Sequence, residues 1–225
     1  FKSAVKAIAA RNGLYASFMP KPLHDQSGNG LHVNMSLMRD GKNLFESPLT
    51  PDSEAGYFVA GILAHARELT AFCNPVPNSY ARLGANEAPL YISWSRQNRS
   101  QLVRLPSASG DLCRVELRGP DPAGNPYLVI GLILAAGLDG IARKLPLAEP
   151  VNRNLFHPSA AVGLESLPRS LREAITVAAQ SDFIAAELPL ALQNKYFEYQ
   201  TQLCHGYENA PDPAVWERTH GFLVI

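Results

Sequence analysis

Three charged side chains alternate with two apolar ones in the segment Arg114–Arg118. In an extended strand, side chains two residues apart share one face, so we expect Arg114, Glu116 and Arg118 to project together. Two guanidinium groups that flank a carboxylate are typical of a site for an anion and a metal ion. An edge strand with a solvated row of ion pairs has the same pattern, and such pairs add little stability. The strand alone therefore predicts a polar face and leaves both interpretations open.

A second stretch, Leu31–Leu37, also alternates, with His32, Asn34 and Ser36 on its polar face. If the two strands lie in one sheet with these faces aligned, His32 and Glu116 approach each other as metal ligands. An imidazole and a carboxylate suit Mn²⁺ or Mg²⁺ when further oxygen ligands complete the coordination sphere. A hydrogen-bonded core histidine is the alternative interpretation of His32.

Arg96, Arg99 and Arg104 lie close together in a stretch that we predict to form a short hairpin. Clustered guanidinium groups repel one another unless an anion or carboxylates compensate their charge, so the cluster favours phosphate binding. Solvated surface arginines would have the same spacing.

Two loops are suited to enclosing a ligand. Arg82 and Glu87 bracket a small-residue stretch at 83–86 that suits a mobile flap, although an ordinary loop has the same composition. The glycines of Gly28–Gly30 allow a close approach of the backbone to a ligand. This segment is too short for a phosphate-loop motif, and a strand is predicted after it where that motif has a helix.

The elements that must position these residues are read from periodicity and from turn residues. A hairpin is predicted around Arg39–Lys42, and the strands and helices together predict the α+β class, with an antiparallel sheet backed by helices. The predicted strands are Leu14–Met19, Leu31–Leu37, Leu90–Trp94, Gln101–Leu105 and Leu112–Leu117. The predicted helices cover residues 1–12, 53–72, 127–144 and 167–203, the last with an interruption at Pro189.

Composition narrows the class of protein. The 225 residues carry 20 basic and 20 acidic side chains, so the balance of charge gives no reason to expect nucleic acid or a membrane as partner. The 3 cysteines, Cys73, Cys113 and Cys204, fit neither a disulfide framework nor a zinc site, which favours the cytoplasm. The longest apolar run, at 128–138, is too short to span a bilayer and is expected to form a buried helix.

A series of short motifs, in order along the chain, closely resembles the glutamine synthetases. Phe18–Pro22 with Gly28–Val33 resembles the family's FMPKP…GSGMH signature, and Asn78–Leu83 with Glu87–Pro89 resembles its NSYKRL…EAP segment. Resemblance is strongest over residues 1–145. The further matching stretches are Trp94–Ser95, Asn98–Ser100, Arg104–Pro106, Arg114–Arg118, Asp121–Pro122, Asn125–Leu128, Leu138–Ile141 and Val215–Arg218.

The family joins glutamate and ammonia at the expense of ATP, through a γ-glutamyl phosphate intermediate. By this resemblance His32 and Glu116 are expected to hold the Mg²⁺ or Mn²⁺ ion that organises the phosphates of ATP. Gly28, Arg82 and Arg118 match positions that bind glutamate.

The remaining roles follow from the same resemblance. Ser36 and Arg114 match nucleotide-contacting positions. Arg99 and Arg104 match the residues that neutralise charge on the transferred phosphoryl group. Glu87 resembles the carboxylate of a flap that shields the acyl phosphate from water and helps to deprotonate ammonium.

Two departures from the family pattern bear on substrates. Asn34 matches a nucleotide-contacting position at which many members have a second histidine. The stretch between Arg82 and Glu87 is one residue shorter than usual, which leaves the choice of amine open. A γ-glutamyl-amine or polyamine ligase and a non-catalytic protein of the same fold are therefore kept as alternatives.

We expect the chain to be the C-terminal portion of a glutamine synthetase catalytic domain, incomplete on its N-terminal side. Residues 1–145 are expected to hold the sheet, the core helices and the active-site motifs, and residues 146–225 a peripheral helical region. The family's other metal carboxylates and its N-terminal β-grasp domain have no counterpart in these residues. The isolated chain is therefore expected to be inactive, and its full-length parent to assemble into homo-oligomeric rings.

Overall fold

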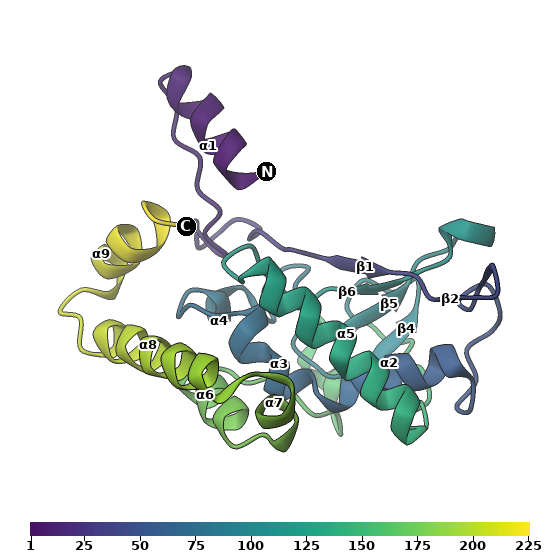
Figure 1. The fold of residues 1–225 in the computed structure, drawn as a ribbon. Coiled ribbons are helices and arrows are strands. Elements are labelled where there is room, and N and C mark those ends of the chain that lie inside the picture. The colour runs from purple at the N-terminus through teal and green to yellow at the C-terminus, as the bar shows by residue number, and fades with distance from the viewer.

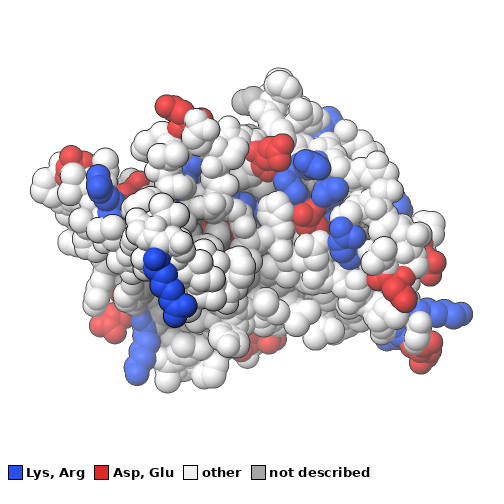
Figure 2. All heavy atoms as spheres, turned by 90° about the horizontal axis from the view of Figure 1, so that it is seen from above, with Lys and Arg blue, Asp and Glu red and all other residues white. Residues whose placement is uncertain are grey.

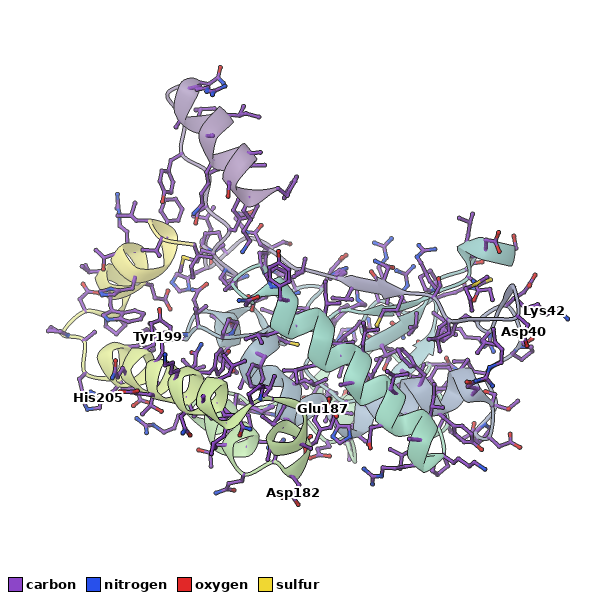
Figure 3. The ribbon with its side chains drawn as sticks, viewed as in Figure 1. Asp40, Lys42, Asp182, Glu187, Tyr199 and His205 are labelled. Atoms are coloured by element: carbon purple, nitrogen blue, oxygen red, sulfur yellow. The ribbon has the colours of Figure 1, made fainter. Side chains whose placement is uncertain are left out.

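The computed structural model describes the backbone of residues 1–225 and every side chain except that of Pro158. A 4-stranded sheet has the strand order β1-β6-β5-β4, and β2 and β3 form a separate hairpin. Figure 3 places Asp40 and Lys42 at the outer end of that hairpin. The strands are β1 (Val33–Met35), β2 (Met38–Arg39), β3 (Lys42–Asn43), β4 (Trp94–Arg96), β5 (Val103–Leu105) and β6 (Val115–Leu117).

Helices lie below the sheet and to one side of it in Figure 1. The α-helices are α1 (Lys2–Arg11), α2 (Glu54–Ala64), α3 (Ala66–Cys73), α4 (Ser79–Arg82), α5 (Pro126–Arg143), α6 (Leu171–Ala179), α7 (Asp182–Glu187), α8 (Leu190–Glu208) and α9 (Pro213–Glu217). Short turns of other helical types are η1 (Gly110–Leu112), η2 (Pro158–Ala161) and η3 (Arg218–Phe222). The helix α1 stands away from the rest of the molecule (Figure 1).

The α+β class is confirmed, but the sheet is mixed. Strand β6 pairs antiparallel with β1 and with β5, as expected, whereas β4 pairs parallel with β5. The prediction of an antiparallel sheet is therefore wrong for β4. The chain reverses twice between Arg96 and Val103, so β5 runs in the same direction as β4 and no simple hairpin joins them.

The apolar face of the sheet packs on α2 and α5 in one core. Val115 of β6, Phe58 of α2 and Ile133 of α5 are all fully buried in it. The two helices cross very closely, because a Cβ added to Gly61 would lie 2.1 Å from the Ala136 oxygen. The core therefore leaves the opposite face of the sheet free for polar side chains.

Helix α5 was expected to be buried, and this is correct for one side only. Its outer side carries Tyr127, Ile130, Leu134 and Leu138, with exposed fractions between 41% and 87%. By length and composition α5 also meets the criterion for a helix that crosses a membrane, which the core helices of globular proteins often meet too.

Several predicted elements differ in the structure. The helix predicted over 167–203 is interrupted at Gln180–Ser181 as well as at Leu188–Pro189. The strand expected at Leu14–Met19 is an irregular segment, because in the described chain no strand lies beside it to complete its hydrogen bonds. Of Leu90–Trp94 only the last residue joins the sheet, while Tyr91 forms a single bridge with Ser166. The helix predicted over 53–72 is divided at His65 into α2 and α3.

Candidate functional site

Strands β1 and β6 place their polar residues on one face of the sheet. Asn34 is directly opposite Glu116 across this pair, and Arg104 of β5 is opposite Glu116 on its other side. Apolar and polar residues alternate in each strand. Because the apolar residues enter the core, the polar residues between them must lie on the opposite face of the sheet. The same register, extended by one residue, sets His32 beside Arg118. The predicted alignment of the two polar faces is therefore confirmed.

Glu116 is the centre of the polar cluster. Its Oε1 lies 2.9 Å from His32 Nδ1 and 3.4 Å from an Arg118 Nη1, and its Oε2 accepts a hydrogen bond from Arg104 Nη1 at 2.8 Å. Only 9% of the Glu116 side chain is exposed. A nearly buried carboxylate is thus paired with two guanidinium groups and one imidazole.

This pairing sets the charge states of Glu116 and His32. Burial alone raises the pKa of Glu116, but the hydrogen bond from Arg104 and the charge of Arg118 outweigh it and lower that pKa. Burial and the Arg118 charge lower the pKa of His32 more than Glu116 raises it. The imidazole is therefore neutral at pH 7, with its Nδ1–H directed to the carboxylate and the lone pair of Nε2 available.

An imidazole nitrogen and a carboxylate oxygen are both donors that Mg²⁺ or Mn²⁺ accepts. The donor chemistry of His32 and Glu116 therefore fits a divalent cation. Among the described side chains, however, no group of three or more His, Cys, Asp and Glu residues lies close enough to hold a metal ion. By themselves the two residues can supply only part of a coordination sphere.

A pocket of about 200 Å³ opens beside this cluster at the end of β6. His32 and Arg118 line it from the sheet, Arg82 from α4, and Gly28 and Glu87 from loops. Arg118 also donates from Nη2 to the Glu87 carbonyl (3.3 Å), which ties the flap segment to the strand. The residues expected to bind glutamate are thus brought together around one cavity.

Close packing around this pocket requires a glycine at position 28 and buries Arg82. A Cβ added to Gly28 would lie 2.3 Å from the Pro20 oxygen and 3.2 Å from Arg82 Cγ, so a larger residue does not fit. Arg82 donates to the carbonyls of Gly119 (2.7 Å) and Arg118 (3.2 Å). Arg82 therefore holds the chain after β6 as well as lining the pocket.

The sequence interpretation missed one buried charge near this site, Asp121. It accepts hydrogen bonds from Asn74 Nδ2 (2.8 Å) and from the backbone N–H of Ala123 (2.9 Å). Burial raises the pKa of Asp121, and hydrogen bonds from Asn74 and Ser79 with the charge of Arg82 oppose that shift. Burial lowers the pKa of Arg82, and the negative charge of Asp121 opposes that shift. The signal that could have pointed to Asp121 was the Asp121–Pro122 pair, which was interpreted only as part of a family motif and of a turn.

A second pocket, of about 170 Å³, lies at the other end of β6 and is lined by Arg114. Arg114 Nε donates to Asn34 Oδ1 (3.1 Å), and the Ser36 hydroxyl donates to the Cys113 carbonyl (2.9 Å). Arg96 and Gln97 line the same cavity from the end of β4. The three residues expected to contact a nucleotide are therefore gathered at this end.

Two catalytic predictions receive less support from the geometry. Arg99 contributes its backbone carbonyl, which accepts a hydrogen bond from Arg118 Nε (3.1 Å), whereas its side chain is exposed. Glu87 is also exposed, at the rim of the first pocket. Figure 2, a view from above, shows basic side chains gathered around acidic ones on this face. The roles assigned to Arg99 and Glu87 remain predictions.

Comparisons with known proteins identify the family of this chain. Residues 1–219 match the family model described as glutamine synthetase, catalytic domain. The chain is 52% identical over 196 residues to a glutamine synthetase of Methanosarcina mazei. The aligned region covers 84% of this chain and 44% of that protein. It is 45% identical over 205 residues to a glutamine synthetase of Thermotoga maritima, covering 88% of this chain and 47% of that protein. The chain thus spans about half the length of the curated relatives it matches.

Solved structures show the same likeness. The structure "Apo GmaS without ligand" has a TM-score of 0.84 and 37% identity, and the match covers 97% of this chain and 51% of that chain. The structure "GmaS/ADP complex-Conformation 1" has a TM-score of 0.83 and 35% identity, covering 97% of this chain and 52% of that chain.

Proposed function

The chain belongs to the glutamine synthetase catalytic-domain family, and from this premise we propose that it is the C-terminal portion of the catalytic domain of an ATP-dependent glutamate–ammonia ligase. In this reaction a γ-carboxylate oxygen of glutamate attacks the γ-phosphorus of ATP, and ADP leaves. Ammonia then attacks the acyl carbon of γ-glutamyl phosphate, phosphate leaves, and a proton is released.

One observation carries the proposal: β6 joins two pockets through a single charged face. Arg114 lines one pocket, Arg118 lines the other, and Glu116 lies between them. In the proposed function, the nucleotide binds over Arg114, Asn34 and Ser36, and glutamate binds over Arg118, with Arg82 and Gly28 close by. The phosphoryl group then passes from one ligand to the other across the middle of the strand. The ADP complex named for one solved relative supports nucleotide binding by this fold.

Arg104 is the arginine best placed to act during the transfer. It lies opposite Glu116, and its side chain is 20% exposed, so part of the guanidinium faces the open side of the sheet. A fixed positive charge there stabilises the negative charge that develops on the transferred group. Arg99 is proposed to add to this charge, and Glu87 to accept the proton of the incoming ammonium at the rim of the glutamate pocket.

We propose His32 and Glu116 as two ligands of a Mg²⁺ or Mn²⁺ ion, which would neutralise charge on the phosphates when bound. Two ligands are too few for a catalytic metal site, so we propose that further carboxylates come from the rest of a longer protein. The isolated chain is then inactive. We also propose cytoplasmic, homo-oligomeric rings for the full-length form, as its curated relatives are glutamine synthetases.

The test is glutamine formation by the purified full-length protein. We expect it to require glutamate, ammonium, ATP and Mg²⁺ or Mn²⁺ together, and the isolated 225-residue chain to give none. Arg104→Gln should abolish most of the activity. Arg172→Gln, which removes an arginine that pairs with Glu208 and lines neither pocket, is the matched control and should leave the activity unchanged. A full-length protein that binds ATP and glutamate without turnover would favour a non-catalytic role.

A second candidate is a γ-glutamyl-amine ligase that accepts an amine other than ammonia. It is favoured by the short flap between Arg82 and Glu87 and by the likeness to GmaS, whose name differs from that of the curated relatives. A panel of amines with the full-length protein separates the two candidates. Preference for ammonium over methylamine, ethylamine and putrescine supports the first, and the reverse order supports the second.

A further inference from the structure

The chain leaves β4 through an unusual turn centred on Gln97. This residue has a φ of 65°, in the left-handed region, and the Asn98 N–H donates across it to the Arg96 carbonyl at 2.8 Å. A positive φ with a hydrogen bond to the second residue back is typical of the classic γ-turn, which is rare and strained. Such a conformation persists only where the surrounding structure requires it, and it is concentrated at functional sites.

Both backbone groups of Gln97 contact β5. Its N–H donates to the Leu105 carbonyl (2.9 Å), and its own carbonyl accepts a hydrogen bond from Arg104 Nε (3.2 Å). The same guanidinium donates from Nη1 to Glu116 Oε2 (2.8 Å). Arg104 is therefore held at two points, by a carboxylate on the next strand and by the carbonyl of the strained turn.

We propose that Gln97 is a positioning residue, whose backbone carbonyl orients the Arg104 guanidinium toward the phosphoryl group. The inference rests on the proposed role of Arg104. Because a guanidinium is planar, fixing Nε and Nη1 fixes the direction of the remaining N–H groups, which are then free to contact a ligand. Without the turn, only Glu116 would hold Arg104, and its orientation would be reorganised during the reaction at a cost in rate.

The backbone and not the side chain of Gln97 has this role, which makes the proposal testable by substitution in the full-length protein. Glycine and asparagine both adopt a positive φ, so Gln97→Gly and Gln97→Asn should retain kcat within about twofold at saturating ATP, and any effect of the lost pocket-lining side chain is read separately in the KM for ATP. Valine rarely adopts that conformation, so Gln97→Val should rotate the peptide and lower kcat by up to about a hundredfold, with the KM for glutamate nearly unchanged. The kcat of Gln97→Ala should lie between these two limits. If Gln97→Val does not fold, Gln97→Ala takes its place in the comparison.

Lys144 offers a matched control for backbone strain. It has a φ of 53° at the C-terminal cap of α5, outside both pockets, so Lys144→Val should lower the melting temperature without lowering kcat. A fall in kcat for Lys144→Val equal to that for Gln97→Val would mean a general loss of stability and would overturn the proposal. So would equal losses for the glycine and valine variants of Gln97, because the side chain would then be responsible.

A double-mutant cycle separates this inference from the proposed function. If Gln97 acts through Arg104, then Gln97→Val should cause no further loss of kcat in an Arg104→Gln background. Additive losses would overturn the positioning role. Unchanged kcat in Arg104→Gln alone would instead contradict the proposed function. A full effect of Arg104→Gln with none from Gln97→Val would contradict only the inference.

Discussion

Arg104 and Glu116 are direct neighbours across β5 and β6, with Arg104 Nη1 2.8 Å from Glu116 Oε2. The carboxylate is shared with His32 and Arg118, so one buried negative charge holds two cations and a neutral imidazole in place. Removal of one member of such a group leaves the others without their partner in a poorly solvated site.

Metal affinity should depend on His32 and not on histidines in general. His32→Gln removes the imidazole with a free Nε2, and we expect the affinity of the full-length protein for Mn²⁺ to fall by at least about tenfold. His65→Gln is the matched control, because both ring nitrogens of His65 contact carboxylates, at 2.6 Å from Glu68 and 2.8 Å from Asp139. Electron paramagnetic resonance of free Mn²⁺ measures both affinities. Equal affinities for the two variants would contradict a role for His32 as a ligand.

Substitutions at the two ends of β6 should change the KM values of different substrates. Arg118→Lys keeps the charge but loses the planar fork, and the loss of a charge-assisted hydrogen bond should raise the KM for glutamate by about ten- to a hundredfold. Arg114→Lys should raise the KM for ATP by a similar factor. Steady-state kinetics of the full-length variants give all four values. The prediction fails if each substitution changes both KM values equally.

Stability should depend on pH through His65. Burial lowers the pKa of His65, but hydrogen bonds to Glu68 and Asp139 outweigh it, so the folded pKa lies above the ordinary value of about 6.5. Arg143, which pairs with Asp139 at 3.0 Å, is the nearby cation, and the Phe183 ring stacks on the imidazole at 3.9 Å between centroids.

Since the folded pKa is raised, the imidazolium stabilises the fold fully below pH 6.5, and this contribution is lost as the pH rises through the folded pKa. We therefore expect the difference in unfolding free energy between the wild type and His65→Gln to shrink from pH 6 to pH 9. Urea unfolding at a series of pH values measures it. A difference that stays constant or grows over this range would contradict the prediction.

The crossing of α2 and α5 should tolerate no added methyl group. Gly61→Ala would set its Cβ 2.1 Å from the Ala136 oxygen, so the helices must move apart, at a cost of about 1–3 kcal/mol. Gly131→Ala lies on the outer side of the same α5, where no described atom beyond its chain neighbours and the nearby backbone of the helix is within 4 Å of the added Cβ. It should stabilise the protein by about 0.4–1 kcal/mol. Equal melting temperatures for the two variants would show that the crossing is not tightly packed.

Much of the candidate site could be predicted from local sequence, for physical reasons. Alternation in Leu31–Leu37 and in Arg114–Arg118 determines which side chains share a face, because the period of a strand is two residues. The approach of His32 to Glu116 followed once both strands were placed in one sheet. The place of Arg99 could not be predicted in this way, because it lies in a turn, where side-chain direction follows the path of the loop and not a strand or helix period.

The tertiary structure decided the rest. The register that sets Asn34 opposite Glu116 joins residues far apart in the chain. The insertion of β5 beside Glu116 and the parallel direction of β4 depend on the path of the loops between the strands. The strain at Gln97 has the same origin, because two reversals must fit between β4 and β5. The sequence by itself determined the residue types, the polar face of each strand and the family. Long-range packing determined which faces meet, because local periodicity carries no information about the partner of a strand.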